Sequence, residues 1–191
     1  VPDPEWQAAL EDAQRQMGLC RRPRLMASAG VGGPLVTGLL RPVLLVPLQA
    51  PPREQAVLML AHELTHLRRR DLGCKLVLVL AAAVHWYNPA VWLLLRRAGR
   101  DIEAACDEQA VAGKDHAFRA AYSDALLRAA RMGRAPSLTT GFALSRRDWA
   151  ERLRQLWDLT PKRRGRTALA GLALCALLAG GLVSCRMPTE D

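Results

Sequence analysis

The sequence is poor in aromatic residues and has no paired cysteine motif. Its 191 residues include only two Phe, two Tyr and five Trp, whereas Leu and Ala dominate. This composition favours helices, packed against each other or against lipid. The five cysteines form no Cys-x-x-Cys motif and no even framework, which argues against a disulfide scaffold and suits a reducing cytosol.

The positive charge is unevenly distributed along the chain. A formal net charge of +9 is compatible with either nucleic acid or an anionic membrane as a partner. Residues 146–166 alone contain eight basic and three acidic side chains, next to an apolar segment. No segment resembles a recognition helix with interleaved aromatic residues. We therefore predict contact with membrane lipid and no direct binding of nucleic acid.

The pentapeptide His62-Glu63-Leu64-Thr65-His66 is the most informative motif. On a helix, His62 and His66 project from one face, close enough for two imidazoles to share a metal ion, with Glu63 beside them. Neutral imidazoles suit zinc, and a neighbouring carboxylate can take a proton from metal-bound water. The alternative is a helix whose two histidines are only packed or solvated.

A third metal ligand has few candidates, because the only other histidines are His85 and His116. Glu103 is a better candidate, since two histidines and one carboxylate leave a fourth zinc position free for water. Asp107 follows one helical turn later and could accept the second ring N–H of a ligating histidine. The alternative for both acidic residues is a solvated helix face, and Cys106 between them is expected to pack rather than to bind metal.

Three motifs in the same order connect this chain to a known family. The segments HELTHLRRRD, HWYNPAVW and RDIEAACDEQA resemble those of the BlaR/MecR-type membrane metallopeptidases, metallopeptidase family fifty-six, with a gluzincin-like zinc site. The resemblance implies a Zn²⁺ ion on His62, His66 and Glu103, Glu63 as the catalytic base, and Asp107 behind the ligands. It also implies preceding membrane helices and a bacterial enzyme that cleaves itself or a cytoplasmic repressor in signalling, in the regulation of antibiotic resistance.

The expected fold is mainly α with a small antiparallel β-sheet, an α+β zincin-like domain followed by a transmembrane helix. Short apolar runs separated by Gly and Pro predict the strands at 25–28, 35–37 and 43–46, with an irregular loop as the alternative. An edge of this sheet could hold substrate as an added strand. The predicted parts are an N-terminal helix and linker at 1–22, a metallopeptidase domain at 23–160 (sheet 24–47, zinc helix 53–70, second ligand helix about 91–112), a transmembrane helix at 167–185 and a tail at 186–191.

Residues 76–95 contain no Lys, Arg, Asp or Glu. This charge-free stretch is long enough to cross a membrane as a helix. His85 and Asn88-Pro89 interrupt this stretch, so we predict two shorter helices that meet at a bend, buried in the domain or dipping into the bilayer interface. Asp71, just before the stretch, is expected to cap the first of these helices.

Two more residues are candidates for a hydrogen bond to the oxyanion of a tetrahedral intermediate. His85 could lie near the zinc, although a packed or interfacial histidine is the simpler interpretation. Tyr122 belongs to the apolar stripe of a helix expected at 118–131, where an aromatic residue is normally part of the core. A last amphipathic helix is expected at 149–159.

Residues 167–185 form a charge-free stretch of 19 residues, about 28 Å long as a helix and close to the hydrocarbon thickness of a bilayer. Four basic residues precede it within 162–166, and only Arg186 follows it closely. The positive-inside rule then places the catalytic domain on the cytoplasmic side of the bacterial cell membrane.

These features predict a membrane-anchored zinc endopeptidase acting on a peptide or protein substrate. The alternative is a non-catalytic, zinc-stabilised membrane scaffold that relays a signal through helix movement, but an intact Glu63 is of no use to a structural zinc site. None of the serines begins a Ser-x-x-Lys motif, so the sequence gives no support for a β-lactam input. The substrate, the activating signal and the oligomeric state, with a homodimer among the alternatives, are left open.

Overall fold

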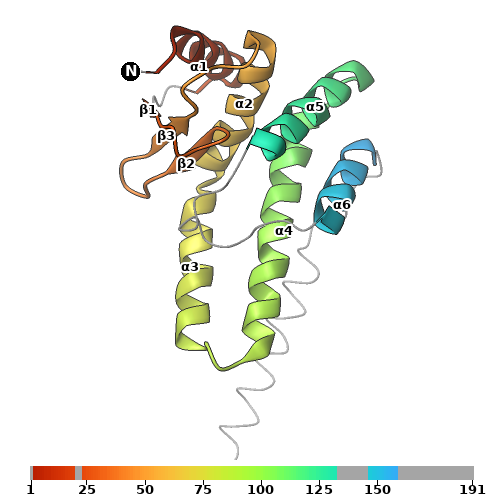
Figure 1. Cartoon of the computed structure of the whole chain (residues 1–191). Helices are drawn as coiled ribbons and strands as arrows, with labels where there is room; N and C mark the ends of the chain where they lie inside the picture. The colour runs from red at the N-terminus through yellow and green to blue at the C-terminus, as the bar shows by residue number, and fades with distance from the viewer. Residues whose placement is uncertain (1, 20–22, 133–145, 159–191) are drawn as a thin grey trace, which may run out of the picture. The chain divides into compact units, whose positions relative to one another are not determined.

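A computed structural model describes residues 2–19, 23–132 and 146–158 of the chain (Figure 1). This part is mainly helical, with one small sheet, and so belongs to the predicted α+β class. In chain order the elements are α1 (Pro4–Met17), β1 (Arg24–Ala27), β2 (Leu35–Thr37), β3 (Val43–Val46), α2 (Arg53–Arg69), α3 (Asp71–Val84), α4 (Pro89–Val111), α5 (His116–Met132) and α6 (Arg146–Trp157).

Local signals explain where α1 begins and ends. The carboxylate of Asp3 accepts a hydrogen bond from the backbone N–H of Glu5, and Pro4 occupies the first turn, where its missing N–H costs nothing. Gly18 ends the helix with φ +62°, a left-handed conformation that glycine adopts without strain. The apolar face of α1 is then free to pack on α2.

The sheet has the predicted strands but a different pairing from the predicted one. Its order is β1-β3-β2, with β3 antiparallel to β2 and parallel to β1. The chain does reverse between successive strands, as the turns predict. However, β3 inserts between β1 and β2, so the expectation of a purely antiparallel sheet was wrong and the sheet is mixed. This arrangement leaves β2 as an edge strand.

The main core lies between α1, the sheet and α2. Trp6 and Leu60 are fully buried in it together with Leu44 and Val46 of β3. The indole N–H of Trp6 donates to the carbonyl of Pro47 at 3.0 Å, which satisfies its one polar atom inside the core. This core therefore fixes the orientation of α2. The apolar face of the helix is turned to the core, and the neighbouring polar face is turned to α4.

A second core cluster attaches α6. Val111, Tyr122, Leu126 and Leu156 are buried together where α4, α5 and α6 meet. Arg119 of α5 crosses this cluster and donates to the backbone carbonyls of Leu156 and Val111. These contacts hold α6 against α4.

The long apolar stretch forms a bent pair of helices, as predicted. α3 ends at Val84, α4 begins at Pro89, and the side chain of Asn88 caps α4 by accepting from the N–H of Ala90. Among the helices of the described residues, none is both long and apolar enough to cross a bilayer. The helix predicted at 167–185 and the tail at 186–191 lie outside the described residues.

Candidate metal centre

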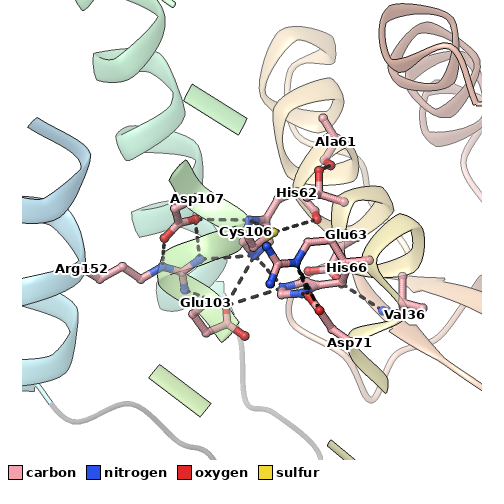
Figure 2. A network of polar contacts seen from close by, with 12 residues as sticks. Val36, Ala61, His62, Glu63, His66, Asp71, Glu103, Cys106, Asp107 and Arg152 are labelled. Carbon is pink, nitrogen blue, oxygen red and sulfur yellow. Dashed lines mark hydrogen bonds and ion pairs between the residues drawn. The ribbon is translucent and has the colours of Figure 1, made fainter. Parts of the chain in front are cut away.

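The two histidines of the pentapeptide meet at their Nε2 atoms. His62 and His66 lie one turn apart on α2, both are buried, and their Nε2 atoms are 3.2 Å from each other (Figure 2). The rings are nearly perpendicular, at 87°. A metal ion shared by two imidazoles requires that their ligating nitrogen atoms converge, as these Nε2 atoms do.

Glu103 of α4 completes this group. Its Oε2 lies 3.6 Å from Nε2 of His62 and 3.6 Å from Nε2 of His66. Ligand atoms placed about 2.1 Å from a tetrahedral metal ion are separated by roughly 3.4 Å. The three atoms therefore form a triangle of the size that such an ion fits, and their N, N, O chemistry is that of an open metal site.

The other ring nitrogen of each histidine is already occupied. Nδ1 of His66 lies 2.7 Å from Oδ2 of Asp71, and a carboxylate can only accept, so this nitrogen carries the proton. Nδ1 of His62 lies 2.7 Å from the hydroxyl of Tyr122, which in turn donates to Asp107 at 2.9 Å. Both histidines are thus oriented with Nε2 facing Glu103.

Asp71 and Asp107 differ in how well the sequence predicted them. The expectation that Asp71 caps α3 was wrong: its side chain makes no capping hydrogen bond and instead bonds His66 and the guanidinium of Arg69. Asp107 does lie at His62, with Oδ1 3.4 Å from Nδ1, but the hydroxyl of Tyr122 is the closer partner.

Cys106 offers a second possible ligand set. Its side chain is fully buried, and together with His62 and His66 it forms a group whose donor atoms lie within 4.8 Å of one another. However, its Sγ is 3.5 Å from Nδ1 of His62, the nitrogen that Tyr122 already occupies. Glu103, in contrast, faces the Nε2 atoms of both histidines, so the carboxylate set fits a metal ion better.

Arg152 of α6 is a site residue that the sequence did not predict. Its guanidinium bonds both carboxylate oxygens of Asp107 at 2.5 and 2.9 Å, and it lies 3.3 Å from Oε2 of Glu103. Its Nη2 is also 3.2 Å from Nε2 of His62. One available signal is that Arg152 occupies the apolar stripe of its helix, between Trp149 and Leu156, where a charged residue needs a buried partner.

Opposite charges compensate each other within this buried group. Burial lowers the pKa of His66, but the hydrogen bonds to Asp71, Cys106 and Glu103 together outweigh burial and raise the pKa to about 11. Burial raises the pKa of Glu103, yet the hydrogen bonds from His62 and His66 hold it well below 4.5. Burial also raises the pKa of Asp107, but its hydrogen bonds to His62 and Arg152 and their positive charges lower it to about 2. A metal ion would displace any proton on the Nε2 atoms, while the Nδ1 protons stay in their hydrogen bonds.

Glu63 points away from this triangle towards the sheet. Its Oε2 accepts a hydrogen bond from the backbone N–H of Val36 at 3.0 Å, as Figure 2 shows. Val36 belongs to β2, the edge strand. The carboxylate next to the two histidines is therefore fixed at the free edge of the sheet.

Neither candidate for oxyanion stabilisation lies at the Nε2 atoms of the two histidines. His85 ends α3, about 20 Å along the helix from Asp71, is exposed, and has a ring contact with Tyr87. The structure does not bring it to the site. The hydroxyl of Tyr122 is at the site, but at Nδ1 of His62 and not at Nε2.

A hollow adjoins the group on the side of α6. It has a volume of about 270 Å³ and lies between α4 and α6, with Glu103 and Arg152 among its lining residues. The rest of the lining is mostly charged and includes Arg97, Arg100, Asp101, Asp148 and Glu151.

Comparison with known proteins identifies the family of the chain. Residues 2–156 match the family model described as BlaR1 peptidase M56. Over 106 residues the chain is 28% identical to the Regulatory protein BlaR1 of Bacillus licheniformis, a match that covers 54% of this chain and 18% of that protein. The chain thus corresponds to a small part of that relative. Because the family model covers most of the chain, the protein belongs to the BlaR1 peptidase M56 family.

Proposed function

We propose that this chain is the catalytic domain of a membrane-anchored zinc endopeptidase of the BlaR/MecR type. The observation that carries the proposal is the triangle formed by Nε2 of His62, Nε2 of His66 and Oε2 of Glu103, with edges of 3.2, 3.6 and 3.6 Å. These three atoms would hold the zinc ion. When bound there, zinc polarises a scissile carbonyl and lowers the pKa of water towards about 7.

Glu63 is the proposed general base. It follows His62 directly in the chain, and its carboxylate accepts a hydrogen bond from the backbone N–H of Val36. To take a proton from the attacking water and deliver it to the leaving amine, this carboxylate would release Val36 and turn towards the triangle. Its position at the edge of β2 puts the proton acceptor where peptide backbone would lie.

The residues behind the ligands orient them. Asp71 fixes the ring of His66, and the pair Tyr122 and Asp107 fixes the ring of His62. Arg152 binds Asp107 and Glu103 together, so their negative charges are held in place. We assign Tyr122 this orienting role in preference to oxyanion stabilisation.

The proposed substrate is an extended peptide segment of this protein itself or of a cytoplasmic regulator. An added segment can pair with the backbone of an edge strand, and β2 is the edge next to Glu63, where the segment would take the N–H of Val36 from the carboxylate. The name of the relative, a regulatory protein, supports a role in signalling. The charge-free residues 167–185 with their basic flank support anchoring in the cell membrane, with the catalytic domain on the cytoplasmic side.

Zinc content and cleavage, measured on the same preparations, test this function. The chain is reconstituted into lipid vesicles with zinc, and intact mass reports self-cleavage while unstructured casein serves as an added probe. Glu63→Gln should retain one zinc per chain and lose cleavage at least a hundredfold. Glu54→Gln, an exposed change on the same helix, is the matched control and should cleave like the parent.

The same measurement separates the enzyme from a non-catalytic zinc-stabilised scaffold. A scaffold would bind zinc in the parent and in Glu63→Gln but would cleave neither itself nor casein. Cleavage by Glu63→Gln at the rate of the parent would instead contradict the assignment of the base.

A further inference from the structure

The helical hairpin formed by the end of α3 and the beginning of α4 exposes a large apolar surface. We define its tip as residues 76–95, of which only Ala82 is buried. The exposed fractions reach 65% for Val77, 68% for Val84, 70% for Trp86 and 67% for Leu93. Contiguous apolar patches of this extent are rare on surfaces that face water and normally mark a contact site.

The charges of the hairpin are confined to its base. The tip contains no Lys, Arg, Asp or Glu, whereas Lys75 directly precedes it and Arg96 and Arg97 directly follow it. Because α3 and α4 run in opposite directions around a turn at 85–88, these basic residues lie at similar heights, about 12 to 15 Å from the turn. The apolar tip matches the hydrocarbon layer of an anionic membrane leaflet, and the basic residues next to the tip match its headgroup layer.

The turn satisfies most of its own hydrogen-bonding groups. The indole N–H of Trp92 donates to the carbonyl of Trp86 at 2.8 Å, and the N–H of Ala90 donates to the side chain of Asn88 at 3.0 Å. The N–H groups of His85 and Asn88 bond the carbonyls of Ala81 and His85. A turn can enter an apolar medium only when its backbone groups are paired in this way.

The length of the hairpin fits one leaflet and not a whole bilayer. The apolar part of α3 from Leu76 to Val84 is about 14 Å long, roughly half of the hydrocarbon core. Trp86, Tyr87 and Trp92 are exposed near the turn and would lie deepest in the leaflet, where the indole N–H of Trp92 is already satisfied by the carbonyl of Trp86.

From these observations we infer that the α3–α4 hairpin dips into one leaflet of a lipid bilayer, with Arg96 and Arg97 at the phosphate groups. The occupant of the apolar surface is therefore lipid. The basic residues that flank the tip favour anionic lipid headgroups, and the tip has no acidic or basic side chain with which a protein could pair. This inference needs neither the metal ion nor the cleavage reaction, so it can fail or succeed independently of the proposed function.

Photo-crosslinking in the full chain tests which molecule covers the hairpin. Benzoylphenylalanine replaces Trp86 or Leu93 in chain reconstituted into phosphatidylethanolamine and phosphatidylglycerol vesicles, and mass spectrometry identifies the adducts. Leu40, 86% exposed between β2 and β3, is the control position for an apolar residue away from the hairpin. We expect lipid adducts at positions 86 and 93 and none at 40.

The other occupants give different adducts. A crosslink to peptides from residues 167–185 would show that the chain's own apolar segment covers the hairpin, and a crosslink between two chains would show a second copy. Either result, or equal lipid labelling at position 40, overturns the inference.

Fluorescence quenching provides a second measurement that does not need the unnatural residue. Phosphatidylcholine brominated on its acyl chains quenches tryptophans that enter the leaflet. The quenched fraction should fall by about twofold or more when Trp86 and Trp92 are both replaced by Phe, because both exposed indoles are near the turn and would lie among the acyl chains. Trp157→Phe, a change on α6, should leave the quenched fraction unchanged or raise it. Equal quenching in the parent and the double variant would contradict insertion.

Discussion

Nη2 of Arg152 lies 3.2 Å from Nε2 of His62, although 90 positions separate the two residues in the chain. The same guanidinium is paired with Asp107 and Glu103, so it brings a positive charge into the group that would hold the metal ion. A nitrogen lone pair serves one partner at a time. Arg152 and a metal ion therefore compete for His62, and α6 is coupled to metal binding.

Replacing Arg152 by Met should weaken the metal-free protein and increase its response to zinc. Breaking a buried ion pair leaves Asp107 without its partner, which should lower the free energy of unfolding by about 3–5 kcal/mol. Zinc should then raise Tm more in the variant than in the parent, because no guanidinium opposes the ion. Thermal unfolding with and without zinc measures both effects.

Arg154→Met is the control for this variant, since Arg154 is exposed on the same helix. It should leave the stability and the zinc-induced rise in Tm unchanged. An equal rise in Tm for Arg152→Met and the parent would show that Arg152 and zinc do not compete.

Asp71→Ser should lower the affinity for zinc by about 10- to 100-fold, because His66 loses the carboxylate that fixes its ring. Serine is as good a helix cap as aspartate, so it would preserve any capping function at the start of α3. Zinc affinity measured by competition with a chelator decides between the two roles. Unchanged affinity in Asp71→Ser would mean that the contact with His66 is unimportant for the metal.

The two possible ligand sets predict opposite results for Glu103 and Cys106. With Glu103 as the ligand, Glu103→Gln should bind zinc at least a hundredfold more weakly, while Cys106→Ala keeps one zinc per chain. The absorption spectrum of the cobalt-substituted protein is an independent check, because a thiolate ligand adds a charge-transfer band that a carboxylate lacks. Loss of zinc in Cys106→Ala with retention in Glu103→Gln would establish the thiol set.

The features that the sequence predicted correctly are those that neighbouring residues determine. The i, i+4 spacing puts His62 and His66 on one face of α2, and Asn88-Pro89 both ends one helix and caps the next. The strands at 35–37 and 43–46 have the predicted bounds because Gly and Pro delimit them. Each of these signals acts within a few residues.

The features that the sequence did not predict depend on packing between distant elements. The order β1-β3-β2 is decided by which strands bury their side chains against α1 and α2, and the strand sequences themselves do not contain it. Asp71 lies five residues from His66, but it reaches the ring because the left-handed residue Arg70, with φ +61°, turns the chain between α2 and α3. Arg152 reaches the site because Leu156 and Arg119 attach α6 to α4 and α5.

Tyr122→Phe separates an orienting role for this residue from a role in stabilising an oxyanion. Its hydroxyl lies between Nδ1 of His62 and Asp107, so its removal should weaken zinc binding by about 10-fold or more, as other changes behind metal ligands do. With zinc at saturation, kcat should then change by less than about tenfold, whereas loss of an oxyanion donor costs about 10²- to 10³-fold in kcat. Zinc affinity and casein cleavage at saturating zinc, measured on one preparation, give both numbers. A large loss of kcat with unchanged zinc affinity would place the hydroxyl at the substrate instead of behind His62.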